Sequence, residues 1–115
     1  MYKLVKTCIF FILLRLGNAV NDADFNQAVV FVRSIPRDQS TLSQDQQLSF
    51  YANFKQATVG TCKQHGGAQP LIFQFEARLK WDAWNALGEK TSDSAKSDYI
   101  KMLDESVPDW RNWQC

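Results

Sequence analysis

The chain has 115 residues, a length typical of one domain. Its composition, with 45% hydrophobic and 22% charged residues, excludes a chain that is disordered over its whole length. Thirteen Lys and Arg residues against twelve Asp and Glu residues give a net charge of +1, without the basic excess of a domain that binds nucleic acid through phosphates. His65 is the single histidine and the three cysteines form no CxxC pair, which disfavours a multi-histidine zinc enzyme and a disulfide scaffold.

Residues 1–19 form an apolar N-terminal segment of their own. The segment contains three basic residues and no acidic residue, and its apolar run spans residues 8–14. That run is too short to cross a membrane, which takes about 20 apolar residues. Without this segment the remaining chain has 10 basic and 12 acidic residues, so its own charge is slightly negative.

Three interpretations of residues 1–19 stay open. The first is a secretory signal peptide cleaved after Ala19, and the second is an uncleaved helix that contacts a membrane surface. The third is either an extra helix packed on the domain or an artefact of a wrongly chosen translation start. The first interpretation places the protein in the secretory pathway or outside the cell, and otherwise we expect it in the cytoplasm. An oxidising compartment could pair Cys62 with Cys115, although their spacing does not show that they pair.

The first predicted helix covers about residues 24–35. Its apolar residues fall at i, i+3, i+4, i+7 and i+10, which is the spacing of one helical face: Phe25, Ala28, Val29, Val32 and Ile35. Asp22 or Asp24 is expected to cap its start, and Pro36 to end it.

The second predicted helix covers about residues 44–59. Ser43 and Gln46 have the spacing of a capping box at its start, and Gly60 ends it. A loop is expected over residues 61–74, since it contains two consecutive glycines and Pro70.

Two further helices are predicted over about residues 76–87 and 93–106. The first carries Trp81 and Trp84 three positions apart, and the second is expected to be capped by Thr91 or Ser92. We expect a tail over residues 108–115, whose tryptophans Trp110 and Trp113 fold back onto the domain. The sum is an all-α domain of four helices over residues 20–107.

Three strings in this order carry a family resemblance: KQATVG at residues 55–60, KWDAWN at residues 80–85, and Tyr99-Ile100. Together they resemble the acyl-CoA-binding protein family, also called diazepam-binding inhibitor or endozepine, over about residues 25–103. The resemblance implies a four-helix up-down-down-up bundle with a shallow ligand bowl. It also implies non-covalent binding and carriage or buffering of medium- to long-chain fatty acyl-CoA by a monomer, with no cofactor, no metal and no reaction.

An acyl-CoA ligand has phosphates that need cations and donors, an adenine that needs a flat platform, and an acyl chain that needs a dry groove. Tyr51 and Lys55 are four residues apart and therefore lie on one helix face, where they can form a phosphate clamp. By resemblance, the head-group contacts are those two residues together with Phe54, Lys80, Tyr99 and Arg33. The candidates for the acyl groove are Phe25, Ala28, Leu48 and Phe50.

Two positions depart from the family pattern. Phe54 stands where the family usually has a tyrosine, so the ring is kept and a hydroxyl contact is lost. Gln47 stands where a methionine of the acyl contact region is common.

Cys62 and His65 are three residues apart, but without an orienting carboxylate they do not indicate catalysis or a metal site. The alternative function is a secreted or membrane-associated relative that acts as a ligand or adaptor, through residues 1–19 and the tryptophan tail.

Overall fold

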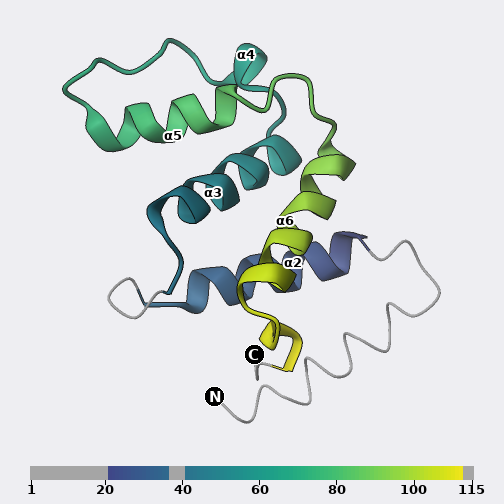
Figure 1. Ribbon diagram of the computed structural model, residues 1–115. Helices are drawn as coiled ribbons and strands as arrows, with labels where there is room; N and C mark the ends of the chain where they lie inside the picture. Colours follow the sequence, from purple (N-terminus) through teal and green to yellow (C-terminus); the bar gives the residue numbers. More distant parts are fainter. Residues whose placement is uncertain (1–20, 37–40, 113–115) are drawn as a thin grey trace. The chain divides into compact units, whose positions relative to one another are not determined.

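The computed structural model describes residues 21–36 and 41–112, and all regular secondary structure in them is helical (Figure 1). Residues 41–99 form one compact unit, and residues 21–36 with 100–112 belong to a second. In this part of the chain, no helix is both long and apolar enough to cross a membrane. The elements are α2 (Asn21–Ser34), α3 (Gln44–Thr58), α4 (Cys62–His65), α5 (Phe75–Asn85), α6 (Ser92–Ser106) and the 3-10 helix η3 (Trp110–Asn112).

Helix α3 begins and ends where local sequence signals place its limits. Ser43 Oγ accepts a hydrogen bond from the Gln46 amide at 3.1 Å, and the Gln46 side chain accepts one from the Ser43 amide at 2.8 Å, which confirms the capping box. At the other end, Gly60 has a φ of 119° and its amide donates to the carbonyl oxygen of Lys55. Glycine adopts this left-handed conformation without a Cβ penalty, so the helix stops there.

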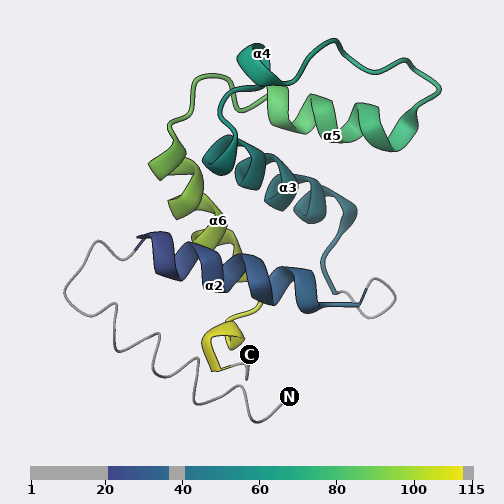
Figure 2. The ribbon, with the colours of Figure 1, turned by 180° about the vertical axis from the view of Figure 1, so that it is seen from behind.

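Helix α5 lies along α3, and the two helices remain side by side in both views (Figures 1 and 2). The predicted loop over residues 61–74 is wrong at its beginning, because residues 62–65 form the one-turn helix α4. Thr61 caps this turn by accepting a hydrogen bond from the Gln64 amide at 3.3 Å. A turn this short has little stability of its own, and burial of Cys62 in a cluster with Ala52 and Trp84 holds it in place.

The segment that enters α5 presents apolar side chains to solvent. Gln74 closes a turn here, because its side chain accepts from the Leu71 amide and its own amide donates to the Leu71 carbonyl oxygen, each at 2.9 Å. Helix α5 then begins one residue earlier than predicted and ends at Asn85. The exposed apolar side chains are Leu71, Ile72, Phe73, Phe75 and Leu79.

A polar cluster holds the connection between α5 and α6 against α3. The Lys90 ammonium donates to Asn53 Oδ1 at 3.0 Å and to Asp98 Oδ2 at 2.6 Å. The buried Gln56 amide donates to the carbonyl oxygens of Gly88 and Lys90, each at 2.9 Å. Because these partners come from three segments, the cluster ties them together.

Helix α6 begins one residue earlier than predicted, at Ser92. Thr91 is its cap, since its Oγ1 accepts a hydrogen bond from the Ser94 amide at 3.1 Å. Ser92 Oγ donates to the carbonyl oxygen of Ala57 at 2.6 Å, which adds a further bond to α3.

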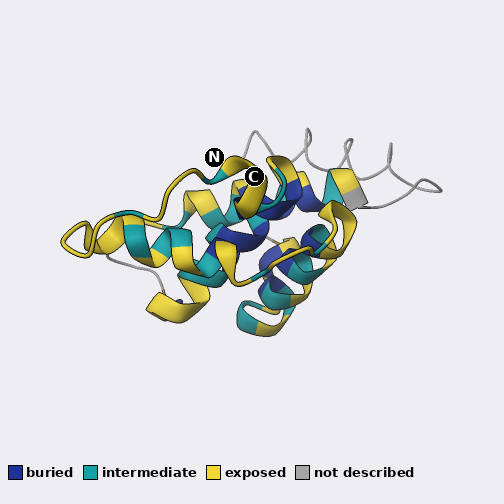
Figure 3. Ribbon diagram, turned by 90° about the horizontal axis from the view of Figure 1, so that it is seen from above, coloured by how far each residue is buried: buried dark blue, intermediate teal, exposed yellow. Residues whose placement is uncertain are grey.

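In the second unit, α2 begins at Asn21, so Asp22 and Asp24 lie in its first turn. The expectation that one of them caps the helix is wrong. Acidic residues in the first turn still stabilise the helix, because they interact favourably with its dipole. Phe25, Ala28 and Val29 of the predicted apolar face are buried. Bands of buried and exposed residues alternate along the helices, as the sequence spacing predicts (Figure 3).

Trp110 folds back onto its own unit, as expected. It is 1% exposed, its Nε1 donates to Asp104 Oδ1 at 2.7 Å, and its ring centre lies 6.3 Å from that of Phe31. The Arg111 guanidinium lies 4.7 Å from the centre of the indole ring and pairs with Asp104. The expectations for Trp113, Cys115 and residues 1–19 lie outside the described residues.

Candidate functional site

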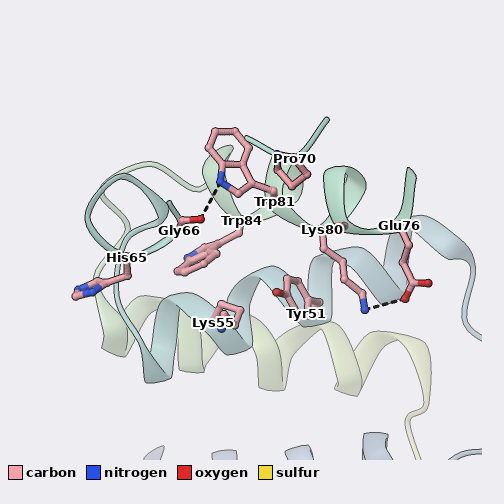
Figure 4. Close-up of a pocket in the computed structure, with 10 residues that line it drawn as sticks. Tyr51, Lys55, His65, Gly66, Pro70, Glu76, Lys80, Trp81 and Trp84 are labelled. Carbon is pink, nitrogen blue, oxygen red and sulfur yellow. Dashed lines mark hydrogen bonds and ion pairs between the residues drawn. The ribbon is translucent and has the colours of Figure 1, made fainter. Parts of the chain in front are cut away.

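A pocket of about 580 Å³ opens within the unit of residues 41–99 (Figure 4). Helices α3 and α5 supply most of its wall, and the end of α4 with the following loop supplies the remainder. Its lining mixes charged groups with aromatic rings: Tyr51, Lys55, His65, Gly66, Pro70, Glu76, Ala77, Lys80, Trp81 and Trp84.

Two lysines from different helices bring positive charge to this pocket. Lys55 comes from α3, and its Nζ lies 5.0 Å from the centre of the Trp84 ring. Lys80 comes from α5, and its Nζ lies 5.4 Å from the centre of the Tyr51 ring and 2.9 Å from Glu76 Oε2. Cations over aromatic faces are attracted by the ring quadrupole, so both ammonium groups are oriented along the pocket wall.

Two tryptophans of α5 form hydrogen bonds with the backbone between α3 and α5, beside the pocket. Trp84 is 5% exposed, and its Nε1 donates to the Gly60 carbonyl oxygen at 2.9 Å. Trp81 is only partly buried, and its Nε1 lies 3.2 Å from the carbonyl oxygen of Gly66 and 3.3 Å from that of Gly67. Trp84 is therefore a core residue of this unit, whereas Trp81 keeps part of its ring accessible.

The long loop before α5 is fastened to the same helix. Arg78 donates to the Pro70 carbonyl oxygen at 3.2 Å, and Gln69 donates to Asp82 Oδ1 at 2.8 Å. These bonds hold the loop where Pro70 can form part of the pocket lining.

The Cys62 thiol beneath this loop has the properties of a packing residue. Burial raises its pKa, and the negative charge of Asp82 raises it further. A thiol with a raised pKa stays protonated at neutral pH and is a poor nucleophile. Among the described residues, no group of three or more His, Cys, Asp or Glu side chains could hold a metal ion.

The arrangement suits a ligand that is both anionic and partly flat. Two ammonium groups and a phenol can bind phosphate oxygens by charge-assisted and neutral hydrogen bonds. The indole faces offer apolar area for a ring or a chain.

Of the residues proposed from sequence for the head group, the structure brings three together in the pocket: Tyr51, Lys55 and Lys80. Phe54 and Tyr99 do not line it. Tyr99 is 3% exposed, and its ring meets that of Phe50 edge-on with centres 5.0 Å apart.

The other candidates lie elsewhere in the two units. Arg33 is exposed near the end of α2, in the second unit. The acyl-groove candidates Phe25 and Ala28 are buried and belong to that unit too. Leu48 is partly buried and Phe50 is buried in the unit that holds the pocket. The acyl-groove assignment therefore stays a prediction.

Several lining residues were not proposed from sequence as ligand contacts, notably Glu76, His65 and Pro70. Glu76 had a detectable signal, because it precedes Lys80 by four residues and such pairs meet on one helix face. His65 and Pro70 fall within the predicted loop over residues 61–74, and no regular spacing relates them to the two lysines.

Comparisons with known proteins find similar sequences and similar folds. A family model described as "Acyl CoA binding protein" matches residues 22–103. Acyl-CoA-binding domain-containing protein 4 of Oryza sativa subsp. japonica is 34% identical over 89 residues, covering 77% of this chain and 26% of the relative. Acyl-CoA-binding domain-containing protein 6 of Xenopus laevis is 36% identical over 86 residues, covering 75% and 28%. The chain thus spans about a quarter of the length of these curated relatives.

Solved structures show the same similarity over most of their length. The solution structure of the acyl CoA binding protein from Babesia bovis T2Bo is 40% identical, with a TM-score of 0.66, and the match covers 80% of this chain and 99% of that one. The crystal structure of ACBP from Moniliophthora perniciosa is 36% identical, with a TM-score of 0.70, and the match covers 76% and 81%. These matches confirm the all-α fold class and the resemblance that the sequence strings indicated.

Proposed function

This chain belongs to the acyl-CoA-binding protein family, and we propose that it binds fatty acyl-CoA esters non-covalently, to hold or carry them without a reaction of its own. The observation that carries the proposal is the convergence of Lys55 and Lys80, from two helices, on one aromatic-lined pocket. Their residue types and positions are the ones that the family resemblance assigns to the ligand's phosphates.

The charged side chains of the pocket suit the charged part of the ligand. A CoA head group carries several phosphate charges, and each charge-assisted hydrogen bond to a lysine contributes about 1.5–3 kcal/mol. Tyr51 lies beside Lys80 and supplies a hydroxyl donor from α3 (Figure 4). The pocket therefore supports recognition of a phosphate-bearing ligand.

We expect the protein to prefer longer esters because of the apolar part of the ligand. Each methylene removed from water contributes about 0.8 kcal/mol, so a medium- to long-chain ester binds more tightly than a short one if a groove covers its chain. The proposed groove residues are Phe25, Ala28, Leu48 and Phe50, with Phe54, Tyr99 and Arg33 as additional head-group contacts. A monomeric state and membrane contact through residues 1–19 stay predictions.

Titration calorimetry with palmitoyl-CoA, palmitate and free CoA tests the proposed function. We expect palmitoyl-CoA to bind at least tenfold more tightly than either fragment, because only the ester offers both phosphates and an acyl chain. Octanoyl-CoA should bind more weakly than palmitoyl-CoA. Equal affinity for palmitoyl-CoA and palmitate, or no binding of palmitoyl-CoA, would contradict the proposed function.

A further inference from the structure

Glu76 places a carboxylate in the pocket beside one of the two lysines. Its Oε2 lies 2.9 Å from the Lys80 ammonium, one helical turn away on α5 (Figure 4). Both side chains reach solvent, with 67% of the Glu76 side chain and 37% of the Lys80 side chain exposed. Among the residues that line the pocket, Glu76 is the acidic one.

This ion pair has a consequence for any anionic ligand. The Lys80 ammonium already has a negatively charged partner before the ligand arrives. A ligand anion must therefore replace the Glu76 carboxylate at Lys80 or share the ammonium with it. Glu76 is also covalently held within reach of Lys80, so a free carboxylate of equal charge gains little by exchange. A phosphate dianion carries about twice that charge and exchanges favourably.

We propose that Glu76 is an affinity- and specificity-determining residue of the pocket, which occupies Lys80 in the ligand-free protein and yields it to phosphate but not to a carboxylate. The proposal rests on the proposed function, since it assumes that the phosphates of an acyl-CoA reach Lys80. It assigns Glu76 the role of lowering overall affinity while favouring the ester over the free fatty acid.

A purely structural role for the same pair is the competing explanation. A glutamate four residues before a lysine stabilises an exposed helix modestly. Loss of that role would lower the melting temperature without altering ligand preference. The test must therefore measure preference as well as stability.

The experiment compares Glu76→Gln with Glu89→Gln in the full chain, by calorimetry with palmitoyl-CoA and by displacement of that ligand with palmitate. Glu89 is an exposed acid of the same unit that does not line the pocket, so its variant makes the same charge change as a matched control. We expect Glu76→Gln to bind palmitoyl-CoA roughly two- to fivefold more tightly, the range of an exposed ion pair. Palmitate should gain a larger factor, and Glu89→Gln should change neither.

The same substitution in a Lys80→Gln background decides whether Glu76 acts through Lys80. We expect no gain in palmitoyl-CoA affinity there, because no ammonium is left to release. An equal gain in both backgrounds would overturn the proposal in favour of simple charge repulsion. No gain in the parent background, or a lower melting temperature as the sole effect, would overturn it as well. Failure of the unaltered protein to bind palmitoyl-CoA refutes the proposed function itself, which separates the two failures.

Discussion

The indole Nε1 of Trp84 donates a hydrogen bond to the carbonyl oxygen of Gly60 across 2.9 Å. This bond joins α5 to the residue at which the chain leaves α3. The same indole is almost fully buried, and the Lys55 ammonium lies 5.0 Å from the centre of its ring. One side chain thus links the packing of the unit to the orientation of a proposed ligand-binding lysine.

Trp84→Phe should lower the free energy of unfolding by about 1–2 kcal/mol, because the Gly60 carbonyl oxygen loses its donor within a partly buried contact. Urea denaturation followed by circular dichroism measures the change. Trp81→Phe is the control and should cost less, since its indole is more exposed and its hydrogen bonds are longer. Equal costs for the two variants would contradict the special role of the Trp84 bond.

The adjacent glycines after α4 should respond differently to substitution. A Cβ at Gly66 would lie 2.4 Å from the Cys62 sulfur and 2.7 Å from its carbonyl oxygen, so Gly66→Ala should destabilise by about 1–3 kcal/mol through overpacking. Gly67 has a φ of 67° with open space around it, and asparagine tolerates that conformation. Thermal unfolding should therefore show a larger loss for Gly66→Ala than for Gly67→Asn, whose cost is limited to the strain of a positive φ.

Lys55→Gln should weaken palmitoyl-CoA binding by roughly tenfold or more, because a charge-assisted hydrogen bond contributes about 1.5–3 kcal/mol. Arg33→Gln should weaken it less. Lys101→Gln removes the same charge from an exposed position of α6 and should leave calorimetric affinity unchanged. Circular dichroism should be the same for all three. Parental affinity in Lys55→Gln would show that the phosphates bind elsewhere.

Phe54→Tyr should leave palmitoyl-CoA affinity unchanged or raise it by up to about tenfold. The substitution restores the hydroxyl that the family usually has on a similar ring, and one net hydrogen bond contributes about 0.5–1.5 kcal/mol. Calorimetry alongside the parent protein measures the difference. Weaker binding by the tyrosine variant would mean that the new hydroxyl is buried without a partner, and that the ligand's ring lies away from this position.

Alkylation of Cys62 should be slow in the folded protein. Burial and the nearby Asp82 charge raise the pKa of this thiol, so little reactive thiolate exists at neutral pH. Iodoacetamide labelling, read by mass spectrometry of the Cys62 peptide, should be much faster in urea. The folded protein holds the thiol proton to higher pH than the unfolded chain, so the thiol's contribution lowers stability as pH rises above its ordinary pKa. Equal labelling rates in both states would refute the buried thiol.

Local sequence determined the helices of this protein and most of their limits. The capping box at Ser43 and the stop at Gly60 depend on groups within one helical turn, so nearby residue types reveal them. The same reasoning failed at α4, where burial of Cys62 stabilises a turn too short to be stable by itself. The long strings KQATVG and KWDAWN also identified the family, because their side chains serve both packing and the proposed site.

Tertiary structure alone decided how these residues combine. Lys55 and Lys80 are far apart in sequence, and only the packing of α5 along α3 brings both to one pocket. Sequence spacing allowed the pair between Glu76 and Lys80, but it could not show that the pair lies at that pocket. Whether a given aromatic ring lines a pocket or fills a core depends on which distant segment covers it, and a local pattern carries no information about that.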